Sequence, residues 1–261
     1  MDFLMIMIMG LSIGAAAGYI GSLMVTKRMA LTGGALGHLT LPGMALALLY
    51  GFDVSFGAFV FLVIGITLIW IFKSSSELSM EAVTAVVFAS SVSIAFLFLP
   101  EEHAFPALIG DVSQVSLLHM VLTVAISLLI FAITKLIYPK MILSSLSEDV
   151  AISEGLNVRK YNLVYLFGIA LAVALGVRVV GSLLTAALVA IPASASKNLS
   201  RNHFQYSYGA LLIGAVSACF GILAYEFIGT PFGIIELDSP GPYIIISSSA
   251  IFVISLFFRR K

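Results

Sequence analysis

The sequence has few charged residues and almost no cysteine. Charged side chains occupy 10% of its 261 positions, against about 25% in an average soluble domain. The mean hydropathy of +1.13 also argues against a soluble globular protein. The one cysteine, Cys219, lies inside an apolar run and can form no disulfide within the chain.

Motifs for chemistry are absent as well. The chain contains no GxxxxGK[ST] loop to cradle nucleotide phosphates, no HExxH zinc motif, no CxxC pair and no GxSxG turn. We therefore expect no enzymatic activity, no cofactor bound by this chain and no nucleic-acid partner. If ATP drives its function, another subunit must hydrolyse it.

Long apolar runs dominate what is present. They lie at residues 3–26, 35–50, 54–72, 82–99, 117–138, 162–177, 182–195, 208–228 and 241–258. A spanning helix needs about 20 apolar residues, so these runs predict an all-α, polytopic transmembrane bundle of about eight or nine spans. No basic residue precedes the first run, which predicts a retained span rather than a signal peptide. We expect one membrane domain, residues 1–261.

Basic residues fall almost entirely in alternate predicted loops. One side would hold Lys27, Arg28, Lys73, Lys135, Lys140, Arg159, Lys160, Lys197, Arg201, Arg259, Arg260 and Lys261, and the other only Arg178. Since lysine and arginine accumulate in cytoplasmic loops, this predicts an external N-terminus and a cytoplasmic C-terminus. Eight acidic residues would then lie outside, where they could concentrate cations, although the same charge bias also leaves acids there.

Small residues suggest two structural features. Gly10, Gly14 and Gly18 recur every fourth residue in the first run, which predicts close contact with another helix. The second run is interrupted by the small or helix-breaking residues Gly33, Gly34, Gly37, Pro42 and Gly43. A broken helix at membrane depth is tolerated where neighbours or a water-filled cavity satisfy its backbone, so this segment is a candidate pathway element.

His38 lies inside the interrupted run. An ionisable side chain in a span suggests a functional site, and imidazole is a common ligand of divalent transition metals. The alternative is a histidine hydrogen-bonded to a neighbouring helix. A single transient ligand would suit conduction, and in a symmetric dimer two copies could face each other. Met44 is a weaker candidate ligand, and His103, His119 and His203 are predicted to be loop, interfacial and surface groups.

Several ordered stretches resemble the permease family of zinc and manganese ABC importers. They are VTKRMALTGGALGHLTLPGMALAL, SEDVAISEGLNVRKYNLV with VVGSLLTAALVAIPASASKNLSR, and LDSPGPYIIISSSAIF. The residues that carry the first two are Arg28, Met29, Ala30, Leu31, Gly33, His38, Leu41, Pro42 and Gly43, then Glu148, Asp149, Ala151 and Gly155, and then Val180, Gly181, Ile191, Pro192 and Ala193.

The resemblance implies a permease subunit of an importer for zinc, manganese or both, in a bacterial or archaeal cytoplasmic membrane. It implies three protein partners: a second copy of the chain, a cytosolic ABC ATPase and an extracytoplasmic metal-binding protein. The ATPase would contact the cytoplasmic loop at about residues 194–205, through Ser194, Lys197, Leu199 and Arg201.

One departure from the family pattern concerns the metal. Gly34 stands where the family usually has an aspartate four residues before the histidine, and Gly37 replaces a serine. Histidine without a carboxylate suits zinc better than manganese, which prefers oxygen ligands. Two other functions remain open: a channel or carrier that works without ATP, and a membrane partner protein that transports nothing. A carrier would be expected to repeat its broken helix, and no second TGGALGH segment occurs.

Overall fold

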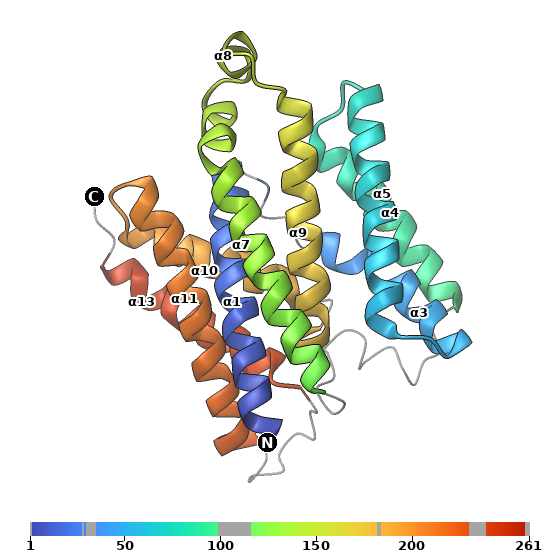
Figure 1. Ribbon diagram of the computed structural model, residues 1–261, viewed down its shortest axis with the longest axis vertical. Helices are drawn as coiled ribbons and strands as arrows, with labels where there is room; N and C mark the ends of the chain where they lie inside the picture. Colours follow the sequence, from blue (N-terminus) through green and yellow to red (C-terminus); the bar gives the residue numbers. More distant parts are fainter. Residues whose placement is uncertain are drawn as a thin grey trace.

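The computed structural model describes residues 2–27, 29, 35–98, 116–181, 184–229 and 239–258. Within these ranges the chain forms helices joined by short turns and contains no strand (Figure 1). The prediction of an all-α membrane bundle is therefore confirmed. In hydrocarbon, a helix satisfies its backbone hydrogen bonds internally, which favours this class for so apolar a sequence.

The helices follow one another with short connections. They are α1 (Asp2–Thr26), α3 (Leu41–Tyr50), α4 (Val54–Ser75), α5 (Met80–Phe98), α7 (Leu117–Leu146), α8 (Glu148–Ser153), α9 (Val158–Val180), α10 (Thr185–Leu199), α11 (His203–Ala224), the π-helical turn η1 (Tyr225–Gly229) and α13 (Gly241–Phe257). One further helical turn, residues 35–38, precedes α3.

Six helices in the described part of the chain are long and apolar enough to cross a membrane: α1, α4, α5, α7, α9 and α11. The segment Ala35–Tyr50 and helix α13 are apolar but shorter, and α10 has only 15 residues. At 1.5 Å per residue such helices fall short of a hydrocarbon core about 30 Å thick. The structure thus supports six spans rather than the expected eight or nine.

Several helices continue beyond their apolar runs. Helix α7 extends to Leu146 instead of ending near residue 138, so Lys135 and Lys140 lie inside it. Arg159 and Lys160 lie in the first turn of α9, where the Asn157 side chain accepts a hydrogen bond from the Lys160 amide. Placing these residues in loops was wrong. Their long apolar stems let a charge reach water from within a helix.

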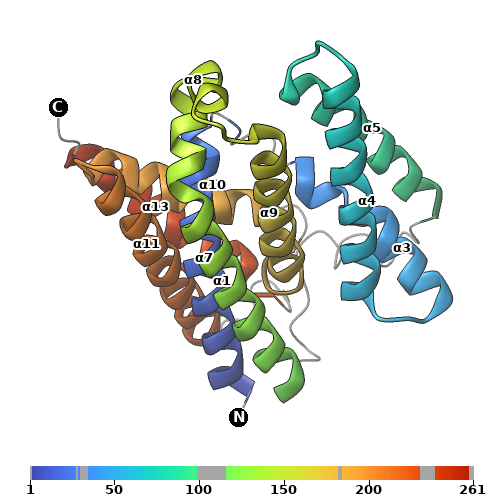
Figure 2. The same ribbon diagram turned by 45° about the horizontal axis from the view of Figure 1, so that its top comes forward.

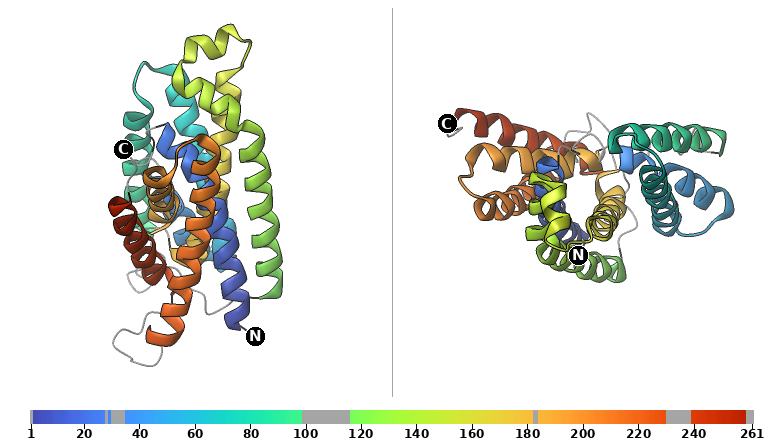
Figure 3. Two further views of the ribbon diagram at one scale, coloured as in Figure 1. Left: turned by 90° about the vertical axis from the view of Figure 1, so that its left-hand side faces the viewer. Right: turned by 90° about the horizontal axis from the view of Figure 1, so that it is seen from above.

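Helix α1 occupies the middle of the bundle, between α7, α10 and α11 (Figures 1 and 3). Its glycines face neighbouring backbones: a Cβ added at Gly14 would collide with the Gly214 carbonyl, and one added at Gly18 would collide with the Ala210 carbonyl. The reverse clash, of a Cβ at Gly214 with the Gly14 carbonyl, is equally severe. The predicted glycine stripe is confirmed as a contact surface.

Helices α3, α4 and α5 form a separate group to one side of the bundle (Figures 1 and 2). They pack on one another, and α4 also contacts α9. Gly43 and Gly57 meet where α3 crosses α4. A Cβ added at either glycine would collide with the backbone carbonyl of the other. Outward-facing side chains of α4 and α5, such as Ile64, Val86 and Phe96, are apolar and exposed, as expected of surfaces that face lipid.

We expect Gly214→Ala to lower the thermal unfolding midpoint of the purified protein. Alanine gains about 1 kcal/mol of helix propensity over glycine, but forcing its Cβ against the Gly14 carbonyl costs about 1–3 kcal/mol. Gly168→Ala in α9 is the matched control, since its Cβ would meet only the flexible end of Ile20. A midpoint for Gly214→Ala at or above that of Gly168→Ala would contradict the close α1–α11 contact.

Candidate functional site

The candidate site is the interrupted segment between α1 and α4. Residues 35–38 form one helical turn, residues 39–40 form a turn, and α3 begins at Leu41. Pro42 fits the start of α3 because the first amides of a helix need no intrahelical acceptor. The interruption thus lies between Gly37 and Pro42, inside the range that the sequence indicated. Gly33 and Gly34 lie outside the described residues.

Thr40 holds the two halves of this segment together. Its hydroxyl donates to the Gly37 carbonyl oxygen at 2.6 Å and lies 3.6 Å from the Met44 sulfur. The Thr40 and Leu39 amides also bond back to the carbonyls of Gly37 and Leu36. Sequence reasoning did not single out Thr40. Its spacing, three residues after Gly37 and four before Met44, is the signal that could have indicated it.

His38 lies half-buried against α5. Its ring centroid is 5.4 Å from that of Phe88, and its Nδ1 atom is buried with no hydrogen-bond partner among the described residues. The next residue, Leu39, packs against Gly65 of α4. A buried ring nitrogen without a partner normally costs free energy, and a neutral imidazole nitrogen is a metal ligand. Nδ1 therefore makes no hydrogen bond to a neighbouring helix among the described residues.

Met44 has a different environment from His38. Its side chain is 5% exposed, and the contact recorded for its sulfur is the Thr40 hydroxyl in its own segment. The neighbouring residue, Gly43, does not break the helix; it lies where α3 crosses α4, against Gly57. In the described part of the chain, no three histidine, cysteine or acidic side chains come together to hold a metal. Among the residues that the structure describes, the site therefore offers a single imidazole and no closed coordination shell.

The predicted ATPase-binding segment forms the corner between α10 and α11. Three residues expected to bind are accessible there, since Lys197, Leu199 and Arg201 are exposed. Ser194 is half-buried within α10 and donates to the Ala190 carbonyl, so it offers little surface to a partner. Helix α10 reaches Leu199 and α11 begins at His203, which leaves a short turn in place of the expected loop of residues 194–205.

Side-chain hydrogen bonds fix this corner. Asn198 donates to Ser255 of α13 at 2.9 Å, and Ser196 donates to the Tyr206 carbonyl at 2.8 Å. The Gln205 side chain accepts from the Arg201 amide at 3.1 Å. The corner is therefore tied to α11 and α13 and presents a defined shape to anything that binds it.

Helix α8 is a second exposed feature outside the long helices. It connects α7 to α9 and projects beyond them at the end of the molecule opposite the N-terminus (Figures 1 and 2). Val150 and Ile152 on it are about half exposed, at 49% and 56%, while Ala151 is buried. Lys73, Lys140 and Lys160 lie near the same end, at the C-terminal ends of α4 and α7 and the N-terminal end of α9.

Comparisons with known proteins agree over nearly the whole chain. The model of the ABC 3 transport family matches residues 2–259. The manganese import system permease protein ScaB of Streptococcus parasanguinis is 25% identical over 259 residues, covering 98% of this chain and 90% of that protein. The high-affinity zinc uptake system membrane protein ZnuB of Buchnera aphidicola is 24% identical over 253 residues, covering 94% of each.

Among solved structures, PsaBC from Streptococcus pneumoniae in complex with Fab has the same fold. Its TM-score is 0.82 at 22% identity, covering 98% of this chain and 91% of that chain. The short helices of the candidate site are thus part of a fold already seen in a solved structure. Because the family match takes in almost every residue, the protein belongs to the ABC 3 transport family.

Proposed function

We propose that this chain is the membrane permease subunit of an ATP-driven importer for divalent transition-metal ions, zinc or manganese. The observation that carries the proposal is the family match over residues 2–259, together with relatives named as manganese and zinc permeases. The working assembly would contain a second copy of the chain, a cytosolic ABC ATPase and an extracytoplasmic metal-binding protein. It would lie in a bacterial or archaeal cytoplasmic membrane.

We further propose that the α8 end of the molecule is cytoplasmic. Lys73, Lys140 and Lys160 lie toward this end, and basic residues favour the cytoplasmic side. The N-terminus, at the opposite end in Figure 1, would then be external, and the C-terminus cytoplasmic. With the shorter segments Ala35–Tyr50, α10 and α13 counted as partial or tilted crossings, the eight or nine spans expected from the sequence would be reached.

His38 is the residue we assign to the passing ion. Its unpartnered Nδ1 supports this role, because it leaves a ring nitrogen free to meet a cation. Two copies of His38 across a dimer axis would give a two-imidazole site, weak enough to release the ion. Met44 would contribute only if its sulfur left the Thr40 hydroxyl.

The ATPase would bind at the cytoplasmic end. The α10–α11 corner, with Lys197, Leu199 and Arg201, is one docking surface, and its ties to α11 and α13 would transmit movement into the bundle. The exposed apolar side chains of α8 form a second surface at the same end. In this orientation both surfaces would lie outside the lipid, where exposed Val150 and Ile152 would gain from a protein partner.

His38→Ala should lower metal uptake by the full complex by roughly ten-fold or more, because even outer-shell ligand changes cost about 10–100-fold in metal sites. The measurement is initial uptake of zinc and of manganese into cells or vesicles that contain the assembled transporter. The reference is the unaltered complex, measured at the same level of assembled transporter. Equal uptake by His38→Ala and by the unaltered complex would remove His38 from the pathway.

Zinc should be taken up faster than manganese at equal free-ion concentration. The reason is the ligand set: an imidazole without the family's aspartate lacks the oxygen ligands that manganese prefers. The comparison uses the unaltered complex. Restoring a carboxylate with Gly34→Asp should shift the ratio toward manganese, and a preference for manganese in the unaltered protein would refute the assignment.

Changing Lys197, Leu199 and Arg201 together to alanine should weaken co-purification of the ATPase by about ten-fold and reduce transport in parallel. A binding surface loses most of its affinity when a few central side chains are removed. Lys160→Ala, an exposed charge at the start of α9, is the control. If the triple variant binds the ATPase normally while Val150→Ser with Ile152→Ser does not, the docking surface is α8 and the corner assignment is wrong.

A further inference from the structure

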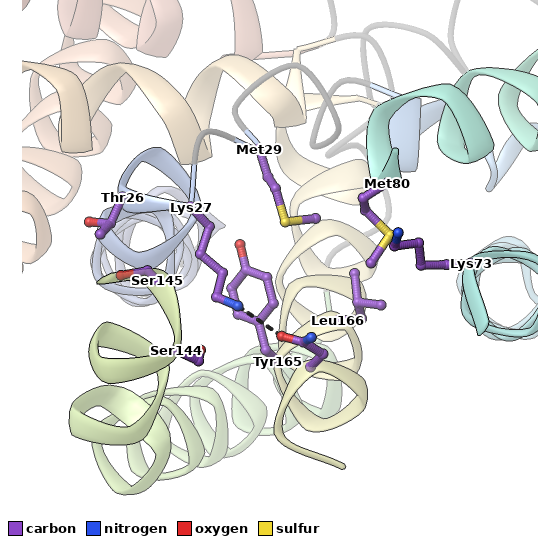
Figure 4. Close-up of a pocket in the computed structure, with 10 residues that line it drawn as sticks. Thr26, Lys27, Met29, Lys73, Met80, Ser144, Ser145, Tyr165 and Leu166 are labelled. Carbon is purple, nitrogen blue, oxygen red and sulfur yellow. Dashed lines mark hydrogen bonds between the residues drawn. The ribbon is translucent and has the colours of Figure 1, made fainter. Parts of the chain in front are cut away.

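A pocket opens at the proposed cytoplasmic end, between α1, α7 and α9 on one side and the ends of α4 and α5 on the other. Its volume is about 330 Å³. Figure 4 shows its lining, which is Thr26, Lys27, Met29, Lys73, Met80, Ser144, Ser145, Asn162, Tyr165 and Leu166. Two lysines line it from facing walls, and the described lining contains no carboxylate.

Lys27 is held at the base of this pocket. It follows the last turn of α1, is half-buried, and donates to the Asn162 side-chain oxygen at 2.8 Å. This partner is neutral, so the ammonium charge has no direct counter-ion there. Burial lowers the pKa of Lys27, and the negative charge of Glu148 only partly offsets that effect. An anion bound in the pocket would stabilise the charged form of Lys27, since the described lining provides no negative charge to do so.

Several donors in the pocket remain available. Each lysine ammonium has three N–H donors. In the described part of the chain, Lys27 donates one to the Asn162 side chain, and Lys73 donates one to the Leu78 carbonyl at 2.8 Å, which leaves two on each lysine. The Tyr165 hydroxyl is buried with no hydrogen-bond partner among the described residues. Ser144 and Ser145 contribute less, because their hydroxyls already donate to the carbonyls of Met141 and Ile142.

The pocket is lined by apolar as well as cationic groups. Met29, Met80 and Leu166 face it beside the two lysines (Figure 4). Its volume is about that of eleven water molecules at ~30 Å³ each, which is more than a phosphate group alone needs. It also opens at the level where α1 leaves its apolar span, which is where lipid headgroups lie.

We infer that this pocket binds the phosphate group of an anionic phospholipid, with Lys27 and Lys73 on the phosphate oxygens and the methionines against the glycerol and first methylene groups. The phosphate would accept charge-assisted hydrogen bonds from both lysines, which are stronger than bonds between neutral groups. Because Lys27 follows α1 and Lys73 belongs to α4, the bound lipid would link the central helix to the α3–α5 group. The inference does not depend on which ion the protein transports.

The test is lipid binding by the purified full-length protein, measured by native mass spectrometry during titration with phosphatidylglycerol and with phosphatidylcholine. We expect phosphatidylglycerol to bind more tightly, and Lys27→Met with Lys73→Met to weaken it by about ten-fold or more without changing phosphatidylcholine binding. Lys140→Met is the matched control. It removes one charge at the same end, but Lys140 lies outside the pocket on the Tyr161 hydroxyl and ring.

Tyr165→Phe keeps the test decisive if the double variant folds poorly. It removes a hydroxyl that has no hydrogen-bond partner among the described residues and keeps the ring, so the fold should survive while phosphatidylglycerol affinity falls about three- to five-fold. Phosphatidylglycerol affinity unchanged in both pocket variants would overturn the lipid site. Inorganic phosphate and glycerol phosphate form the second arm: if they bind with the same dependence on Lys27 and Lys73 and phosphatidylglycerol does not, the ligand is a soluble phosphate and the lipid assignment is wrong.

Discussion

The contact between α1 and α11 depends on the absence of side chains at Gly14 and Gly214, where each backbone carbonyl fills the space that the other's Cβ would need. In a bilayer the lipid tails are as apolar as the side chains, so helices gain little from the hydrophobic effect and must gain from close packing. This contact sets α1 in the middle of the bundle. The positions of α7, α10 and α11 around it follow from that placement.

Polar side chains complete this packing at a few buried points. Ser22 of α1 lies 3.1 Å from the Tyr138 hydroxyl of α7, and its hydroxyl also bonds to the Tyr19 carbonyl. Other buried hydroxyls, such as those of Ser217 and Ser248 on α11 and α13, have no partner among the described residues. Interhelical hydrogen bonds in membranes contribute about 0.6 kcal/mol on average, so glycine packing outweighs them in fixing the arrangement.

Much of this architecture could be predicted from the sequence, because apolar length and glycine spacing are local properties. The all-α class, six of the spans and the role of Gly14 were predictable for that reason. Helix ends were less predictable: α7 passes Lys140 because a helix can continue into water once its own hydrogen bonds are satisfied. The predicted number of spans was too high because the apolar segments at α3, α10 and α13 were counted as full crossings. These helices are short, and hydropathy alone does not distinguish a partial crossing from a complete one.

The candidate site shows the same limit. His38 was identifiable as an ionisable residue in an apolar run. Its contact with Phe88, fifty residues away in the sequence, was not, because the sequence around each residue gives no sign of the other. The pocket beyond α1 brings together Lys27 and Asn162, which are hydrogen-bonded although 135 positions separate them in the sequence. Such constellations arise from the topology of the bundle, which periodicity and composition do not specify.

The grouping of α3, α4 and α5 has a mechanical consequence. Their mutual contacts include the glycine crossing of Gly43 with Gly57, whereas α4 reaches the bundle mainly along α9. A rotation of the three helices as one block would break fewer interactions than a rearrangement within the block. The imidazole packs on that block, because His38 contacts Phe88 of α5 and the adjacent Leu39 contacts Gly65 of α4. His38 would therefore travel with it, and its distance from α1 would change without any rotamer change of its own.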